Sequence, residues 1–235
     1  MRWLAYLLAA IAGIVDVAGF IALGGIFTAH LSGDTVLAAD AFAHRSWPSA
    51  WQHLAPIAFL IAGYLAGGVI VKLCIAKRIP YWFSIGAALE ALFLGAFAAG
   101  HTSLARGSLT FVPAGGSLVA LMFCLSFAMG TQNALVRNVE AIEVRTTFVT
   151  GMVVNFAHEL LDWIFARMHG EDAREDGRRA SVHGAIWVAF FAGGCAGVFL
   201  QVLRGASVFY LPCIAMASIA AYAWLRPLPG LRAGS

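Results

Sequence analysis

Charged residues are scarce in this chain. Asp, Glu, Lys and Arg together make up 11% of its 235 residues, against about 25% in an ordinary soluble domain. Hydrophobic residues make up 61%, which is more apolar surface than a soluble core of this size can bury. The shortage of charge therefore argues against a soluble fold and favours a chain whose solvent is the lipid bilayer.

The sequence also lacks the motifs of several large functional classes. Its four cysteines have no CxxC spacing, so we interpret them as small buried hydrophobic residues. No Ser-His-Asp order, P-loop or dinucleotide fingerprint is present, and we therefore expect no enzymatic activity, no cofactor and no metal. The net charge of +3 is too small and too dispersed for nucleic-acid binding.

Long apolar segments are what the chain has instead. Backbone groups in hydrocarbon must be hydrogen-bonded within their own segment, so apolar runs of about 20 residues predict transmembrane helices. We predict an all-α integral membrane protein with a single membrane domain over residues 1–235. The first apolar run is too long for a signal peptide and contains Asp16, so we expect it to be retained. The six predicted spans are 3–24, 53–73, 81–100, 114–136, 182–203 and 206–225.

Two further segments, 27–44 and 146–166, read as shorter and more polar helices. If they are re-entrant and the N-terminus is cytoplasmic, twelve Lys and Arg residues are inside and three, Arg45, Arg106 and Arg204, are outside. If all eight segments cross, the division is nine to six. We therefore predict six spans plus two re-entrant or tilted helices. The protein would be a multi-pass protein of the bacterial inner membrane, with its N- and C-termini cytoplasmic.

The two halves of the chain, about 1–105 and 112–226, resemble each other. Each contains G-x-x-[D/N], then T-x-x-x-[S/T]-G, then G-x-x-x-G. The first copy comprises Gly13, Asp16, Thr28, Ser32, Gly33, Gly63 and Gly67; the second comprises Gly130, Asn133, Thr146, Thr150, Gly151, Gly193 and Gly197. With three spans and one re-entrant helix per half, the halves would enter the membrane from opposite sides, as in many secondary transporters. Eight spans would instead give parallel repeats, and a duplication can also build a bundle that transports nothing.

Asp16 is the most informative polar residue, because it lies near the middle of the first span. An ionisable group is costly there and must face a partner, water or the bundle interior. We interpret it as a substrate- or proton-binding carboxylate; the alternative is a structural carboxylate capped by hydroxyl or backbone groups. The predicted substrate-binding residues are Asp16, Thr28, Ser32, Gly33, Asp34, Gln132, Asn133, Thr146, Thr150, Gly151 and Asn155.

The other polar residues are weaker candidates. His158 and Asp162, four apart, superficially resemble half of a metal site, but no further ligand is evident. Glu90 lies within a predicted span and is expected to pair with Asp16, His30 or His158. His53 and His101 are at segment ends, where a polar tip at the membrane interface is expected.

The segments GIVDVAGFIALGGIFTAHLSGDTV and GTQNALVRNVEAIEVRTTFVTGMV resemble the YoaK-like family of bacterial membrane proteins, a domain of unknown function (number 1275). The resemblance covers nearly the whole chain and implies a small multi-helix inner-membrane protein. It implies no activity. Asp34 stands where the family pattern usually has asparagine, so the charge preference of any ligand there is expected to differ.

The interpretation is a small inner-membrane permease or channel for a small polar solute or ion, with proton coupling through Asp16. A homodimer is expected as a further partner, and the two GxxxG helices are its candidate faces. The first alternative is a membrane scaffold or partner-binding protein that transports nothing. The second is a membrane-embedded metal enzyme that uses His158, Glu159 and Asp162.

Overall fold

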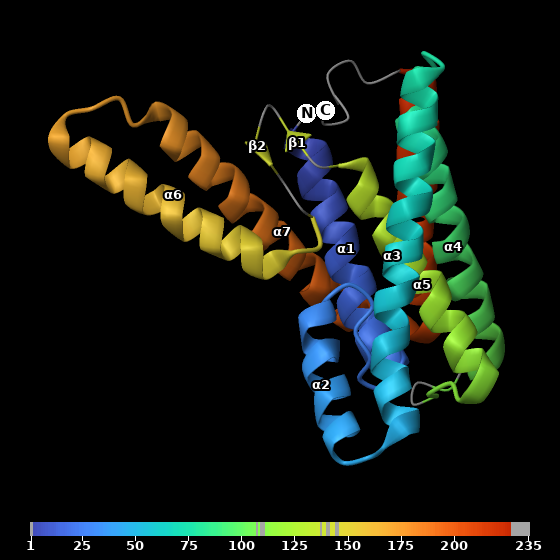
Figure 1. The fold of residues 1–235 in the computed structure, drawn as a ribbon. Helices are drawn as coiled ribbons and strands as arrows, with labels where there is room; N and C mark the ends of the chain where they lie inside the picture. The colour runs from blue at the N-terminus through green and yellow to red at the C-terminus, as the bar shows by residue number, and fades with distance from the viewer. Residues whose placement is uncertain are drawn as a thin grey trace.

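The computed structural model describes residues 2–106, 108, 111–136, 138–139, 142–143 and 146–226. Over these residues the chain forms eight α-helices, one 3-10 helix and one two-stranded hairpin (Figure 1). In chain order they are α1 (Arg2–Ala22), α2 (Leu31–Ala43), α3 (Trp47–Ala76), α4 (Trp82–Ala105), α5 (Gly115–Leu135), β1 (Asn138–Val139), β2 (Ile142–Glu143), α6 (Val149–His169), α7 (Arg174–Arg204), η1 (Gly205–Phe209) and α8 (Tyr210–Leu225).

Five helical segments of the described chain are long and apolar enough to cross a membrane, namely α1, α3, α4, α5 and the continuous segment Arg174–Leu225. The last comprises α7, η1 and α8 and contains two of the six predicted spans. Neither α2 nor α6 is among them. With 13 residues, α2 is about 20 Å long, shorter than a hydrocarbon core of about 30 Å. The prediction of an all-α integral membrane protein is confirmed.

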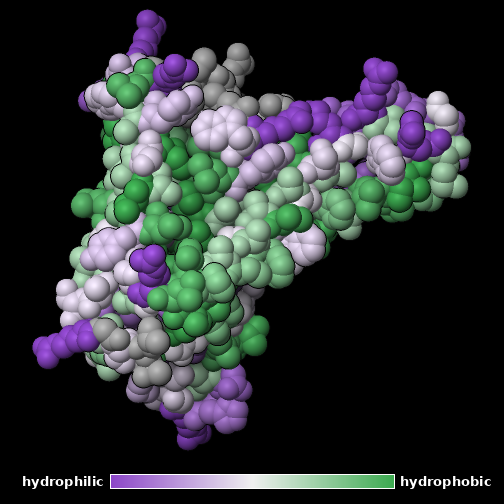
Figure 2. All heavy atoms as spheres, turned by 180° about the vertical axis from the view of Figure 1, so that it is seen from behind, coloured by the Kyte–Doolittle hydropathy of each residue, from purple (hydrophilic) through white to green (hydrophobic). Residues whose placement is uncertain are grey.

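The distribution of side chains fits a bilayer. Figure 2 shows hydrophobic side chains over the middle of the body, with hydrophilic ones at its two ends. The helix α6 and the first half of α7 form an arm that projects from the bundle (Figure 1). Hydrophilic side chains follow the outer edge of this arm (Figure 2). An apolar belt between polar ends is the surface that a membrane-spanning bundle requires.

The hairpin between α5 and α6 was not predicted. Asn138 pairs with Glu143 and Val139 with Ile142, in antiparallel register. Because the hairpin has only two residue pairs, it does not change the all-α fold class. They lie at the same end of the bundle as the first residues of α1 (Figure 1).

Glycine lets α1 and α7 cross at backbone contact. A Cβ atom added to Gly13 of α1 would lie 2.1 Å from the carbonyl oxygen of Phe190 in α7. Conversely, a Cβ on Gly193 of α7 would lie 2.1 Å from the carbonyl oxygen of Ala10 in α1. Small residues permit this approach because nothing but hydrogen separates the two backbones.

The crossing of α3 and α5 repeats this arrangement. A Cβ on Gly130 of α5 would lie 2.1 Å from the carbonyl oxygen of Leu60, and one on Gly63 of α3 would lie 2.1 Å from that of Phe127. The GxxxG motifs of α3 and α7, which the sequence suggested as dimer faces, therefore contact other helices of the same chain. Any interface between two copies would have to use another surface.

The helices α1 and α5 run side by side in opposite directions. The side-chain nitrogen of Gln132, near the end of α5, donates a hydrogen bond to the carbonyl oxygen of Leu8 in α1. Gly19, near the end of α1, faces Leu125 in the middle of α5. Residue numbers thus rise along one helix as they fall along the other. Figure 1 shows that α3 and α7 also run in opposite directions.

Candidate functional site

The carboxylate of Asp16 ties the middle of the bundle to the connection between α1 and α2. Its side chain is buried, with 3% of the residue exposed. One carboxylate oxygen accepts a hydrogen bond from the backbone N–H of Ala29 at 3.1 Å, and the other is paired with Nδ1 of His30. Asp16 therefore holds the start of the short helix α2 against α1.

Asn133 makes the corresponding link in the second half. Its side-chain oxygen accepts a hydrogen bond from the hydroxyl of Thr147 at 2.7 Å. Asn133 follows Gly130 by three residues, as Asp16 follows Gly13, so each lies about one helical turn beyond its crossing glycine. The first half thus uses a carboxylate and a histidine where the second half uses two uncharged side chains.

The chain enters α2 and α6 with the same backbone geometry. The residue before α2 is His30, with φ −89° and ψ 65°. The residue before α6 is Phe148, with φ −93° and ψ 68°. Neither residue caps its helix with its own side chain. The similarity indicates two equivalent entry points, which we call break points, and the residues just before them, Ala29, Thr146 and Thr147, are buried.

Gln132 and Thr146 join the second break point to α1. The amide nitrogen of Gln132 donates to the hydroxyl of Thr146 at 2.9 Å and to the carbonyl oxygen of Leu8 at 3.0 Å. Both polar residues are fully buried. The side chain of Gln132 thus connects α5 both to α1 and to the residues that precede α6.

A second carboxylate anchors α2 to α3. Asp34 is fully buried, and one of its oxygens lies 2.8 Å from Nδ1 of His53. The same oxygen accepts a longer hydrogen bond, 3.4 Å, from the backbone N–H of Phe27. His53, expected as a polar tip at a segment end, is not a free tip, because its ring is held on this buried acid.

The second half has a similar histidine–carboxylate contact. Nδ1 of His183 on α7 lies 2.6 Å from a carboxylate oxygen of Glu159 on α6. Since His53 precedes Gly63 by ten residues and His183 precedes Gly193 by ten, the two histidines occupy matching places. In both halves, a histidine on the longer helix thus holds an acid on the shorter one.

Several polar atoms of α5, of α2 and of the connection before α2 are buried without a hydrogen-bond partner among the described residues. They are Thr28 Oγ1, Asp34 Oδ2, Ser126 Oγ, Gln132 Oε1 and Asn133 Nδ2. Buried polar groups normally have partners, because an unmade hydrogen bond costs about 1–3 kcal/mol. These atoms are therefore able to accept or donate hydrogen bonds to a polar solute or to water.

The predicted site residues differ in burial. The structure places Asp16, Thr28, Asp34, Gln132, Asn133 and Thr146 in the interior. Gly33 is half-buried against Phe27. The remaining four, Ser32, Thr150, Gly151 and Asn155, are exposed on the outer sides of α2 and α6, so the structure does not bring them to the buried cluster.

Glu90 does not make the pairing that the sequence suggested. It is fully buried in α4, and neither carboxylate oxygen has a partner among the described residues. Nε2 of His158 lies 3.5 Å from Oδ2 of Asp162, and both side chains are largely exposed. Within the described part of the chain, no group of three His, Cys, Asp or Glu residues could hold a metal ion.

Sequence reasoning missed His30 and Thr147 as partners of Asp16 and Asn133. A signal was available, since both pairs are separated by 14 residues. It carries little weight alone, because a separation of 14 residues in sequence does not determine contact across a turn.

Comparison with known proteins is consistent with this architecture. A family model described as "Protein of unknown function (DUF1275)" matches residues 4–222. The UPF0700 transmembrane protein YoaK of Bacillus subtilis (strain 168) is 26% identical over 201 residues, which cover 84% of this chain and 80% of that protein. No solved structure matches the chain.

Proposed function

This chain belongs to the DUF1275 family, and we propose that it is a small permease or channel for a small polar solute or ion. The observation that carries the proposal is the pair of equivalent break points, each tied to a buried polar residue of a central helix. Secondary transporters commonly place their sites at such interrupted helices, where two inverted halves meet near the midplane. Antiparallel α1 and α5 support the inverted arrangement for this chain.

In this proposal Asp16 is the proton-coupling residue. It is the ionisable member of the Asp16–Asn133 pair, and its carboxylate contacts both a titratable side chain, His30, and the backbone where α2 begins. A proton on the carboxylate of Asp16 would remove the negative charge that His30 and the N–H of Ala29 contact, and would so weaken the link between α1 and α2. The link between Asn133 and Thr147 has no ionisable member, so coupling would act through the first half.

The solute would be bound by unpaired polar atoms of Thr28, Ser126, Gln132 and Asn133. These atoms include hydroxyl groups, an amide oxygen and an amide nitrogen. Such a set suits a small polar solute, because it offers hydrogen bonds of both directions without a fixed charge. Asp34 would add an acceptor at the edge of this set.

The proposal includes a bacterial inner-membrane location with both termini cytoplasmic, which follows from the Lys and Arg distribution. It assigns no enzymatic activity. It includes a homodimer as a candidate assembly, with an interface elsewhere than the GxxxG motifs, since those glycines are used within the chain.

A non-transporting scaffold is the second candidate, and one observation favours it. Both oxygens of Asp16 are already engaged by the chain itself, as a purely structural carboxylate would be. A scaffold would need Asp16 for folding alone.

The test is solute uptake into proteoliposomes that carry an imposed pH gradient, over a panel of small polar solutes and ions. We expect wild-type uptake above that of empty liposomes for at least one solute. Asp16→Asn should remain folded and lose the stimulation by the pH gradient. The matched control is Asp40→Asn, because Asp40 is an aspartate of the same half of the chain whose side chain is exposed. Uptake no greater than in empty liposomes across the panel would leave the scaffold as the better explanation.

A further inference from the structure

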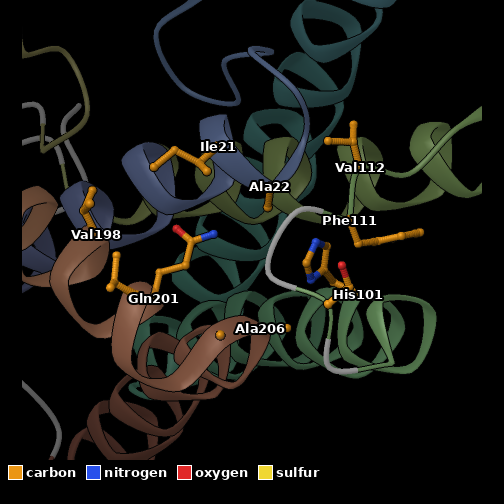
Figure 3. Close-up of a pocket in the computed structure, with 11 residues that line it drawn as sticks. Ile21, Ala22, His101, Phe111, Val112, Val198, Gln201 and Ala206 are labelled. Carbon is orange, nitrogen blue, oxygen red and sulfur yellow. The ribbon is translucent and has the colours of Figure 1, made fainter.

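A separate cavity of about 330 Å³ lies at the end of the bundle where α1, α4 and α7 finish. Its walls come from the last residues of these helices, from η1 and from the chain that follows α4 (Figure 3). None of the residues predicted to bind substrate lines it. Within the described chain, its lining residues include no Asp, Glu, Lys or Arg.

His101 is the principal polar group of this cavity. Only 4% of the residue is exposed, and neither ring nitrogen has a hydrogen-bond partner among the described residues. The ring stacks on Phe97, with centroids 5.6 Å apart, and meets Phe111 and Phe209 edge-on. The expectation of an interfacial polar tip is therefore wrong for His101 too, since its imidazole is buried among aromatic rings.

Gln201 supplies a second unsatisfied group. Its side-chain oxygen is buried and has no partner in the described chain. Figure 3 shows the amide of Gln201 and the ring of His101 pointing into the cavity from opposite sides. The two come from different helices, α7 and α4. The imidazole of His101 thus faces the amide oxygen of Gln201 across a space whose other described lining residues are apolar except for Ser108.

The chemistry of these two groups limits the ligand. A neutral imidazole has one N–H donor and one acceptor nitrogen, and the amide oxygen of Gln201 is an acceptor. A hydroxyl group satisfies both sides, because it can accept from the imidazole N–H and donate to the amide oxygen. A charged head group would be buried without a counter-charge, which is strongly unfavourable.

The rim of the cavity indicates where the rest of the ligand lies. Ile21, Val112 and Val202 line the cavity and are also exposed, Val202 by 70%. The opening of the cavity therefore has an apolar rim, which suits the hydrocarbon part of a ligand better than a polar one. Its volume is about twice that of the ~150 Å³ apolar cavity that holds benzene, which leaves room for a ring and a short alkyl tail.

We propose that this cavity binds a neutral, membrane-soluble amphiphile with a single hydroxyl head group. The hydroxyl lies between His101 and Gln201, and the hydrocarbon part lies among the apolar lining and points toward the lipid. This site goes beyond the proposed transport function. The amphiphile would bind in this cavity whether or not the protein carries any solute across the membrane.

The experiment measures saturable retention of tritiated 4-butylphenol by the full-length protein in lipid nanodiscs, with empty nanodiscs subtracted. Unlabelled 4-butylphenol and butylbenzene are the competitors, since butylbenzene has the same apolar body without the hydroxyl. The variants are His101→Phe, which keeps an aromatic ring, and Gln201→Leu. Leu203→Ala is the control, because Leu203 is an exposed residue of α7 that does not line the cavity.

We expect one saturable site in the wild type and in Leu203→Ala, and at least tenfold weaker binding in each of the other two variants. Butylbenzene should compete at least tenfold less well than 4-butylphenol. Retention equal to that of empty nanodiscs would overturn the proposal, because the cavity would then hold only water. Equal competition by butylbenzene would also overturn it, as would saturable binding that His101→Phe and Gln201→Leu leave unchanged. The competition needs only the wild-type protein, so it remains decisive if a variant fails to fold.

Discussion

Gly13 and Gly130 occupy the same place in two separate helix crossings: a Cβ atom on either would lie 2.1 Å from a carbonyl oxygen of the helix that it crosses. Real Cβ atoms essentially never approach another heavy atom within 3.0 Å. An alanine at either position would therefore force the backbones of two helices apart. The close crossings of α1 with α7 and of α3 with α5 each depend on glycine on both helices, because glycine has no Cβ atom.

We expect Gly13→Ala and Gly130→Ala each to lower the free energy of unfolding by about 1–3 kcal/mol or more, as overpacking does. Gly68→Ala is the matched control, because Gly68 is also within a transmembrane helix but has nothing within 4 Å of its added Cβ. There, alanine should be neutral or should stabilise by up to about 1 kcal/mol. Denaturation in mixed detergent and SDS micelles measures all three. Equal effects at Gly13 and Gly68 would show that the crossing is looser than described.

The two break-point links should differ in strength. The Asp16–His30 contact can be charge-assisted, and such hydrogen bonds are roughly twice as strong as neutral ones. A double-mutant cycle with Asp16→Asn and His30→Gln is expected to give a coupling energy of about 1–3 kcal/mol. The cycle with Asn133→Ala and Thr147→Val should give about 0.5–1.5 kcal/mol. The measurement is again the free energy of unfolding in micelles.

A coupling energy at Asp16 and His30 that is no greater than at Asn133 and Thr147 would contradict this prediction. It would mean that the first link holds no more energy than a neutral hydrogen bond, and Asp16 would lose its distinction from Asn133. The exposed pair His44 and Asp40, four residues apart at the end of α2, provides the reference for a contact open to water, where little coupling is expected.

The helices themselves were predictable from the sequence, because length and apolarity alone decide which segments can cross a bilayer. The buried position of Asp16 and Asn133 was also predictable, since a polar residue within an apolar segment is expected to face the interior. The sequence did not predict which residues of α2 and α6 face outward. Ser32 lies on α2 and Asn155 on α6. The orientation of these helices depends on contacts with α3 and α7, and those contacts are set by the tertiary fold.

His101 shows a second limit of prediction for a membrane protein. In a soluble helix, the apolar face marks the interior, but in lipid both the interior and the outer face are apolar. The sequence around His101 therefore gives no sign of which side of α4 faces the bundle. Its burial against Phe97 and Phe209 became visible only in the structure.

We expect Glu90 to lower the free energy of unfolding of the protein. It is fully buried in α4 and has no partner in the described chain, so its removal relieves an unsatisfied polar group. Glu90→Leu should raise the free energy of unfolding by about 1–3 kcal/mol. Glu171→Leu, at an exposed position beyond α6, should change it by less than about 0.5 kcal/mol. Thermal unfolding in detergent provides the comparison.

A loss of stability in Glu90→Leu would mean that Glu90 has a partner that stabilises the folded state, such as bound water or an ion. If stability rises while solute uptake falls, Glu90 acts in transport, because functional sites are commonly retained at a cost to the fold. Glu90→Gln separates the two effects, since it keeps the shape of the side chain and removes its charge.

The side of the membrane on which each connection lies is the last prediction, and it tests the inverted halves that antiparallel α1 and α5 support. The connections α2–α3 and α6–α7 lie at opposite ends of the bundle (Figure 1). In a variant whose four native cysteines are replaced, Ser46→Cys should react with an impermeant maleimide only from the periplasm, and Glu171→Cys only from the cytoplasm. Both positions are exposed, so accessibility alone does not limit labelling. Reaction of both from the cytoplasm would mean that α2 and α6 cross the bilayer. The halves would then be parallel, and the main structural argument for transport would be lost.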